Sequence, residues 1–75
     1  MTYNGWPNWQ SWNVALWSSA IEPTYRAIYA AKPYTPAEAE QKAREIYPNG
    51  TPDMDSAAEL RGVAWDEIAE AWNET

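Results

Sequence analysis

The segment TPAEAEQKAREIY, from Thr35 to Tyr47, sets the fold class of this chain. It begins with the signals of a helix N-terminus, because Thr35 suits the N-cap, Pro36 the first helical position and Glu38 the third position of a capping box. Apolar residues then recur at helical spacing, at Ala39, Ala43, Ile46 and Tyr47. A proline and a glycine follow directly and break the pattern. The segment therefore predicts a helix over residues 35–47.

The chain before this segment predicts two more helices after an irregular arm. Residues 1–7 contain the turn signal Asn4-Gly5 and form the predicted irregular arm. Asn8 is a suitable N-cap for a helix that runs to about residue 20, and Pro23 suits the start of a second helix. The first of these helices has an apolar stripe that we expect to face the core: Trp9, Trp12, Leu16, Trp17 and Ala20. Asn13 lies on the same side, and its amide must be hydrogen-bonded if it is buried.

The chain after residue 50 predicts a short helix and a final helix. Thr51-Pro52 opens the short helix, which ends near Arg61, with Gly62 as a left-handed stop. The final helix covers about residues 64–72, with apolar residues at helical spacing: Trp65, Ile68, Ala69 and Trp72. No segment has the alternation of a β-strand. We therefore expect an all-α fold, as a compact single domain over residues 1–75 with four or five short helices.

The composition excludes several kinds of chemistry. The 75 residues contain no cysteine and no histidine, which removes disulfides, thiolate zinc sites and histidine-dependent catalytic triads. The serines have no evident activating base, and no glycine-rich phosphate loop occurs. Asp53 and Asp55 lie near Gly50 and Glu59, but without the alternation and the glycine position of a calcium loop. We expect no enzymatic activity, no cofactor and no metal ion.

The charge balance limits the partners of the chain. Eleven acidic and five basic residues give a formal net charge of −6. Repulsion by phosphates argues against direct binding to nucleic acid or to an anionic membrane. No apolar run approaches the roughly 18 residues of a membrane span, and no basic and then apolar leader opens the chain. We therefore expect a soluble, cytoplasmic protein.

Most of the negative charge lies in the last third of the chain. Residues 53–75 hold one basic residue and seven acidic ones: Asp53, Asp55, Glu59, Asp66, Glu67, Glu70 and Glu74. In the final helix, Glu67, Glu70 and Glu74 share a face away from the apolar stripe and extend over about 10 Å. This density resembles the axial charge spacing of roughly 3.4 Å along one DNA strand. An ordinary solvated face explains the pattern, and a recognition surface for a cationic partner is the alternative.

Six tryptophans and five tyrosines make up much of the apolar content. Core filling explains most of the tryptophans, because large aromatic side chains bury much surface. The alternative is that one or two stay exposed and anchor a partner, since tryptophan is enriched in interface hot spots. Trp6 and Tyr3, on the irregular arm, are the best candidates for such an anchor or for folding back over the first helix. Trp72, near the end of the chain, is another.

Two stretches of the sequence carry a resemblance. Residues 4–17, NGWPNWQSWNVALW, fit the pattern NGWxN-aromatic-(E/Q)-(T/S)-WNVxLW, and residues 63–70, VAWDEIAE, are similar to V-D-W-x-E-I-A-E, with Ala64 in place of an aspartate cap. Together they resemble a group of small proteins encoded by phages, prophages and plasmids. No functional residues carry over from this group. The resemblance implies a role in host takeover or counter-defence, in the cytoplasm of a bacterial host.

The resemblance and the charge lead to two hypotheses. Some small acidic proteins of this kind are anti-CRISPR proteins, so the first hypothesis is an inhibitor that binds a DNA-binding subunit of a CRISPR surveillance complex. It would block target DNA through an acidic, DNA-mimicking surface made of the seven carboxylates above and Trp6. The second hypothesis is an accessory or assembly factor of a mobile element that acts through an apolar protein–protein interface, as a monomer or a homodimer.

Overall fold

Helix α3 begins as the sequence predicts. The computed structural model describes residues 3–74, and α3 spans Pro36–Ile46. Thr35 Oγ1 accepts a hydrogen bond from the Glu38 N–H at 3.2 Å, and Glu38 Oε1 accepts one from the Thr35 N–H at 2.9 Å. These bonds form the predicted capping box, because they satisfy backbone donors that the start of a helix leaves unpaired. The start of this helix therefore follows from local sequence.

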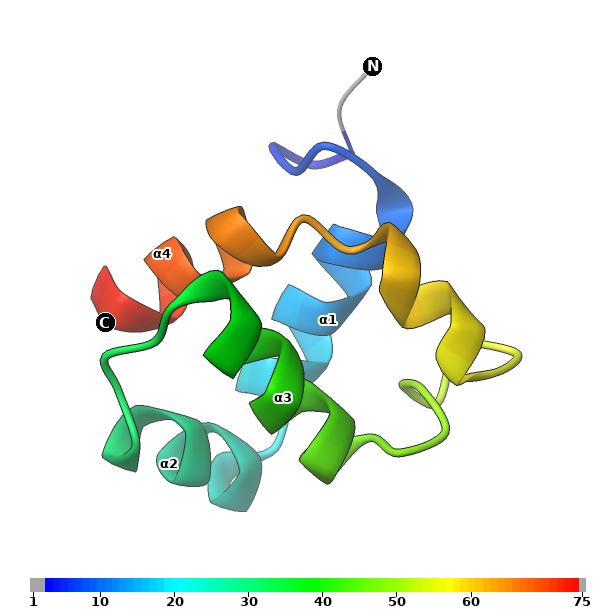
Figure 1. Ribbon diagram of the computed structural model, residues 1–75. Helices are drawn as coiled ribbons and strands as arrows, with labels where there is room; N and C mark the ends of the chain where they lie inside the picture. Colours follow the sequence, from blue (N-terminus) through cyan, green and yellow to red (C-terminus); the bar gives the residue numbers. More distant parts are fainter. Residues whose placement is uncertain (1–2, 75) are drawn as a thin grey trace.

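Residues 3–74 contain four further helices (Figure 1): α1 at Trp9–Ala20, α2 at Glu22–Ala30, the 3₁₀-helix η1 at Ala57–Gly62 and α4 at Trp65–Glu74. α4 packs against α3, α1 and α2, and α1 also contacts α2 and η1. Residues 3–74 contain two isolated β-bridges and no strand, which confirms the all-α prediction. The Cα radius of gyration is 11.1 Å, close to the roughly 11 Å of a compact domain of this length. None of the helices in this range has the length and apolarity to cross a lipid bilayer.

The core is filled mainly by aliphatic side chains from all five helices and the segments between them. Its buried apolar residues are Val14, Ile28, Tyr34, Ala39, Ala43, Met54, Leu60, Val63, Ile68, Ala69 and Trp72. The rings of Tyr34 and Trp72 meet edge to face, with centroids 5.2 Å apart. Asn73 also holds the backbone of Tyr34, because its Oδ1 accepts from the Tyr34 N–H at 2.7 Å and its Nδ2 donates to the Tyr34 carbonyl at 2.9 Å. The connection between α2 and α3 is thereby attached to α4.

The tryptophans fill less of the core than their number suggests. Trp72 is 5% exposed, and the other five are half-buried: Trp6, Trp9, Trp12, Trp17 and Trp65. Trp6, Trp9 and Trp65 pack against the edge of the core. Trp72 is therefore the one tryptophan of residues 3–74 that is buried in the core. The alternative that it is an exposed anchor for a partner is wrong.

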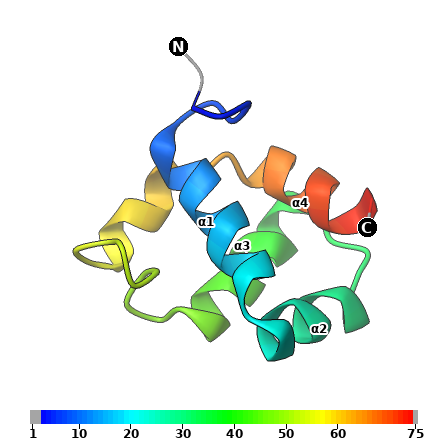
Figure 2. The same cartoon turned by 180° about the vertical axis from the view of Figure 1, so that it is seen from behind.

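The prediction that the apolar stripe of α1 faces the core is confirmed only for Trp9, which packs against its edge. The buried positions of this helix are Ser11, Asn13, Val14 and Ser18, whereas Leu16 is 41% exposed. The small side chains on the buried face leave room for neighbouring segments to come close. Leu16 and Ala20 of the stripe are exposed instead. Figure 2 shows α1 at the front of the molecule, with one side open to solvent.

Hydrogen bonds explain why the polar face of α1 is the buried one. Ser11 Oγ accepts from the Ala64 N–H at 2.8 Å, and Asn8, the N-cap of α1, donates from Nδ2 to the Gly62 carbonyl at 2.6 Å. Asn13 donates to Asp53 at 2.8 Å and accepts from the hydroxyl of Thr51. Buried polar groups are tolerated when they are paired in this way. Specific bonds to the C-terminal third therefore override the apolar periodicity of the helix.

The segment from Thr51 to Gly62 is less helical than predicted. Residues 51–56 form turns, and only Ala57–Gly62 is helical, as the 3₁₀-helix η1. The bonds of Asn13 to Thr51 and Asp53 hold this part against α1 and compete with a helix that would begin at Pro52. Gly62 does not adopt the predicted left-handed conformation, which occurs instead at Gly50 with φ +89°.

The N-terminal arm is more regular than predicted. Asn4 and Gly5 have φ values of +49° and +87°, and Tyr3 and Trp6 exchange backbone hydrogen bonds of 2.6 and 2.8 Å. This is the geometry of a two-residue hairpin turn of type I′, for which Asn-Gly is the favoured sequence. Residues 1 and 2 of the predicted arm, and residue 75 of the predicted domain, lie outside the described residues. The turn fixes the direction in which Trp6 leaves the arm.

Candidate functional site

Helix α4 carries one acidic face. Its buried residues, Ile68, Ala69 and Trp72, pack against the rest of the molecule as the apolar spacing predicts. The four carboxylates all lie on exposed residues: Asp66, Glu67, Glu70 and Glu74. At about 100° per residue they fall within an arc of about 100°, opposite the buried side. The sequence pattern therefore places these four acids together.

The start of α4 is held from another helix. Ala64 precedes it and has no side-chain oxygen to cap it, but the Ala64 N–H donates to Ser11 Oγ at 2.8 Å. Asp66 and Glu67 lie in the first turn, where negative charge is favoured by the exposed N–H groups of the helix end. A bond to α1 and two local charges thus stabilise a helix start at which Ala64 stands in place of an aspartate cap. The acidic face is fixed in place relative to α1.

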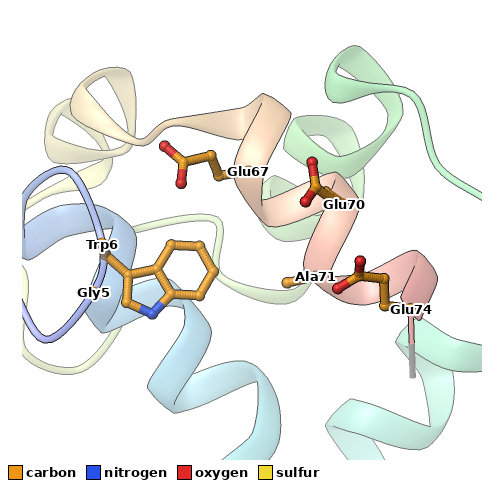
Figure 3. Close-up of a pocket in the computed structure, with 6 residues that line it drawn as sticks. All are labelled: Gly5, Trp6, Glu67, Glu70, Ala71 and Glu74. Carbon is orange, nitrogen blue, oxygen red and sulfur yellow. The ribbon is translucent and has the colours of Figure 1, made fainter.

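A shallow hollow of about 200 Å³ lies between the N-terminal turn and α4. Its lining consists of Gly5, Trp6, Glu67, Glu70, Ala71 and Glu74. Figure 3 shows the six-membered ring of the Trp6 indole turned toward Ala71, with the three glutamates spread along the helix beside it. No basic residue lines the hollow, and no ion pair joins these glutamates to a cation of residues 3–74.

The arrangement suits the binding of a positive group from a partner. A half-buried indole offers a π face to a cation, and exposed carboxylates accept charge-assisted hydrogen bonds. The two ion pairs found in residues 3–74 are Glu22 with Arg26 and Glu40 with Arg44. Neither pair includes an acidic residue of α4. Within that part of the chain no group of three or more acidic side chains has the arrangement of a metal site. The chemistry of this site therefore favours cationic groups over anionic ones.

The carboxylate of Asp53 is held by hydrogen bonds from two side chains of α1. Its Oδ2 accepts from Asn13 Nδ2 at 2.8 Å and from Trp17 Nε1 at 2.9 Å. These two hydrogen bonds lower the pKa of the Asp53 carboxyl from 3.8, the one to Asn13 most strongly. The carboxylate is thus directed at α1 and is engaged there.

Asp55 and Glu59 belong to the same part of the molecule as Asp53. Glu59 Oε2 accepts from the Asp55 N–H at 3.1 Å and so closes the turns before η1. In both Figure 1 and Figure 2 the segment 51–56 lies at the opposite end of the molecule from the C-terminal half of α4. The seven predicted acids therefore do not share one surface. The four acids of α4 share one face, and three of them, Glu67, Glu70 and Glu74, line the hollow with Trp6. The other three acids lie elsewhere.

Two residues of the hollow were not among the candidates from sequence. Gly5 lines it because the type I′ turn brings the arm against α4, and Asn4-Gly5 was the signal for that turn. Ala71 forms its floor, one position after Glu70 on the same helix, and its small side chain leaves space under the Trp6 ring. Comparison with family models, curated proteins and solved structures finds no match to this chain.

Proposed function

We propose that this protein binds a cationic, DNA-binding cleft of a bacterial defence complex and blocks access of DNA to it. The observation that carries the proposal is the set of four exposed carboxylates on one face of α4 beside the half-buried ring of Trp6. No cation of residues 3–74 neutralises this face. A cleft that binds DNA is lined by lysine and arginine, and it is the complementary surface for such a face.

The spacing of the acids supports a DNA-like role. Glu67, Glu70 and Glu74 extend over about 10 Å along the helix, which is about three phosphate steps of one DNA strand. Their charges accelerate encounter with a positive cleft, and this effect weakens as salt screens them. Trp6 supplies the apolar part of the contact, because desolvated tryptophan side chains dominate the energy of many interfaces. Charge thus governs the association rate and the indole governs the lifetime of the complex.

The target class that we propose is a CRISPR surveillance complex, at a subunit that binds target DNA. The support for this target is the resemblance of residues 4–17 and 63–70 to small proteins of mobile elements. Those elements face CRISPR immunity, and an inhibitor that needs no chemistry of its own fits a chain of 75 residues without cysteine or histidine.

A plaque assay tests the proposal. The protein is expressed in bacterial strains that each carry one defence system and is challenged with a phage that each system restricts. We expect plaques to be restored in a strain with a CRISPR system and not in strains with other systems. Absence of rescue in every CRISPR strain would contradict the proposal.

A matched pair of variants separates the site from the overall charge. The site variant combines Glu67→Gln, Glu70→Gln and Glu74→Gln, and the control removes the same number of charges elsewhere. The control changes are Glu22→Gln, Glu45→Gln and Asp55→Asn, all at exposed positions outside α4. With purified surveillance complex and target DNA in a gel-shift assay, we expect at least tenfold weaker inhibition by the site variant, mainly through slower association. Equal inhibition by both variants would refute the role of the α4 face.

The exposed apolar side chains of α1 favour a second candidate function. Leu16 and Ile21 are 41% and 44% exposed, which suits an accessory or assembly factor that docks through an apolar surface. A pull-down from infected host cells, read by mass spectrometry, distinguishes the two. Surveillance-complex subunits support the first function, and phage structural or assembly proteins support the second.

A further inference from the structure

Helix α1 presents an apolar face that the rest of residues 3–74 covers only in part. The large apolar residues that remain exposed in this range are Tyr3, Leu16 and Ile21, at 42%, 41% and 44%. All three belong to α1 or to its ends: the Tyr3 ring contacts that of Trp12 with centroids 5.0 Å apart, and Ile21 is the C-cap of the helix. Exposed apolar surface is thus gathered on one helix instead of scattered over the molecule.

The residues of this face have the spacing of a helix–helix contact. Trp9, Trp12, Leu16 and Ala20 follow one another at steps of three, four and four, and they lie within an arc of about 80° at 3.6 residues per turn. This spacing is typical of the seam between two packed helices. Trp9, at the start of the seam, also packs against the edge of the core, whereas Leu16 and Ala20 further along it are exposed.

Charge restricts the surface through which two copies of this chain can meet. No charged side chain precedes Glu22 in the sequence, whereas every other helix carries charged residues. Two copies with a formal charge of −6 each repel one another, most strongly where carboxylates would meet. Within residues 3–74, α1 is the one helix through which two copies can touch without placing charged side chains in the contact.

We infer that the seam is covered by a second copy of the chain, packed antiparallel through α1 about a two-fold axis near residue 14. In this arrangement Trp9 opposes the partner's Ala20, and Trp12 opposes the partner's Leu16. Each large side chain meets a smaller one on both sides of the axis, as a self-complementary interface requires. Parallel packing would place tryptophan on tryptophan at one end and leave small residues facing each other at the other.

The size of the face sets the strength of the dimer. A standard stable interface buries about 800 Å² per partner, which is a large share of the 4502 Å² that this chain exposes. α1 extends over about 18 Å of a molecule whose longest dimension is 29 Å, so this one helix supplies only part of such an area. We therefore expect a dimer that dissociates in the micromolar range.

Sedimentation equilibrium tests this inference on the full chain. We expect the apparent mass to rise from 8.6 kDa to twice that value between about 1 μM and about 1 mM protein. Leu16→Glu adds a charge to the middle of the seam at a side chain that is already 41% exposed, so it should keep the wild-type helicity and stay monomeric. The matched control, Ala27→Glu, adds the same charge at an exposed position of α2 and should dimerise like the wild type.

Two results would overturn the inference. One is a wild-type chain that stays monomeric over the whole range, and the other is a dimer that Leu16→Glu and Ala27→Glu weaken equally. Ala20→Cys tests the direction of packing in a chain that has no other cysteine. In the antiparallel dimer the two thiols lie about 18 Å apart along the helices, too far for a disulfide. Efficient disulfide formation in this variant would rule out antiparallel packing.

Discussion

The side-chain amide of Asn13 lies 2.8 Å from the carboxylate of Asp53, forty residues further along the chain. The amide is fully buried, and its oxygen accepts a hydrogen bond from the hydroxyl of Thr51. Trp17, one turn after Asn13, donates to the same carboxylate at 2.9 Å. The middle of α1 is therefore bound to the segment that follows α3 by a small network of polar side chains.

Removal of Asn13 should destabilise the fold. Asn13→Ala deletes the donor to Asp53 and leaves the buried hydroxyl of Thr51 without its acceptor. A buried polar group that loses its partner costs about 1–3 kcal/mol, and we expect a loss of this size in the free energy of unfolding. Urea denaturation measures it, with Gln41→Ala at an exposed position of α3 as the control. A loss no greater than that of the control would show that the network does not stabilise the fold.

Asp53 should make the stability of the protein sensitive to acid. Its pKa is lowered in the folded state by hydrogen bonds from Asn13 and Trp17, so the ionised form stabilises the fold. This contribution is complete above the unfolded value of 3.8 and is lost as the pH falls through the lowered pKa. Asp53→Asn should lower the melting temperature at pH 7, and the difference from wild type should shrink below pH 3.8. Thermal melts from pH 2 to pH 7 measure this, and Asp55→Asn should not reproduce it.

Tyr34 should limit stability at the alkaline end. Its hydroxyl donates to the Ile28 carbonyl at 2.5 Å, and burial, followed by the charge of Glu45, raises its pKa above 10.0. The neutral form stabilises the fold below pH 10.0, and this contribution is lost as the pH rises through the raised pKa. Tyr34→Phe should cost about 1 kcal/mol at pH 7 through the lost hydrogen bond. Its stability should then fall less steeply above pH 10 than that of wild type or of Tyr3→Phe, in denaturant titrations at each pH.

Two glycines with the same backbone conformation should differ in their tolerance of alanine. Gly5 and Gly50 have φ values of +87° and +89°, but a Cβ at Gly5 meets nothing, whereas one at Gly50 lies 2.9 Å from the Ser56 carbonyl oxygen. Both substitutions carry the cost of about 1–2 kcal/mol for a left-handed non-glycine residue. Gly50→Ala should cost clearly more than Gly5→Ala in urea denaturation. Equal losses would mean that the backbone near Ser56 moves aside freely.

Local signals were sufficient for much of the fold. The capping box at Thr35 and Glu38 and the Asn4-Gly5 turn each depend on residues within a few positions, and both formed as their sequences indicate. Long-range contacts decided the rest. The orientation of α1 depends on Ser11 and Asn13 finding Ala64 and Asp53, and apolar periodicity alone cannot anticipate such partners. The same bonds explain why residues 51–56 are not helical.

The candidate site also has one part that local sequence predicts and one part that depends on long-range contacts. Glu67, Glu70 and Glu74 share a face because helical spacing within one element fixes their relation. Their proximity to Trp6 depends on how the N-terminal turn packs on α4. No local sequence pattern predicts this packing. Asp53 looked like part of the acidic surface because charge was visible in the sequence and its hydrogen-bond partners were not.

The bonds from α1 to residues 51–53 and to Gly62 and Ala64 have a consequence for how the chain folds. A fragment that ends before Pro48 would keep three helices but lose the segments that cover Ser11 and Asn13 and bond to them. A fragment that begins there would have no surface on which to bury Trp72. Neither half is autonomous, so we expect cooperative, all-or-none unfolding, with the slow event being closure of the long loop that brings the two ends together.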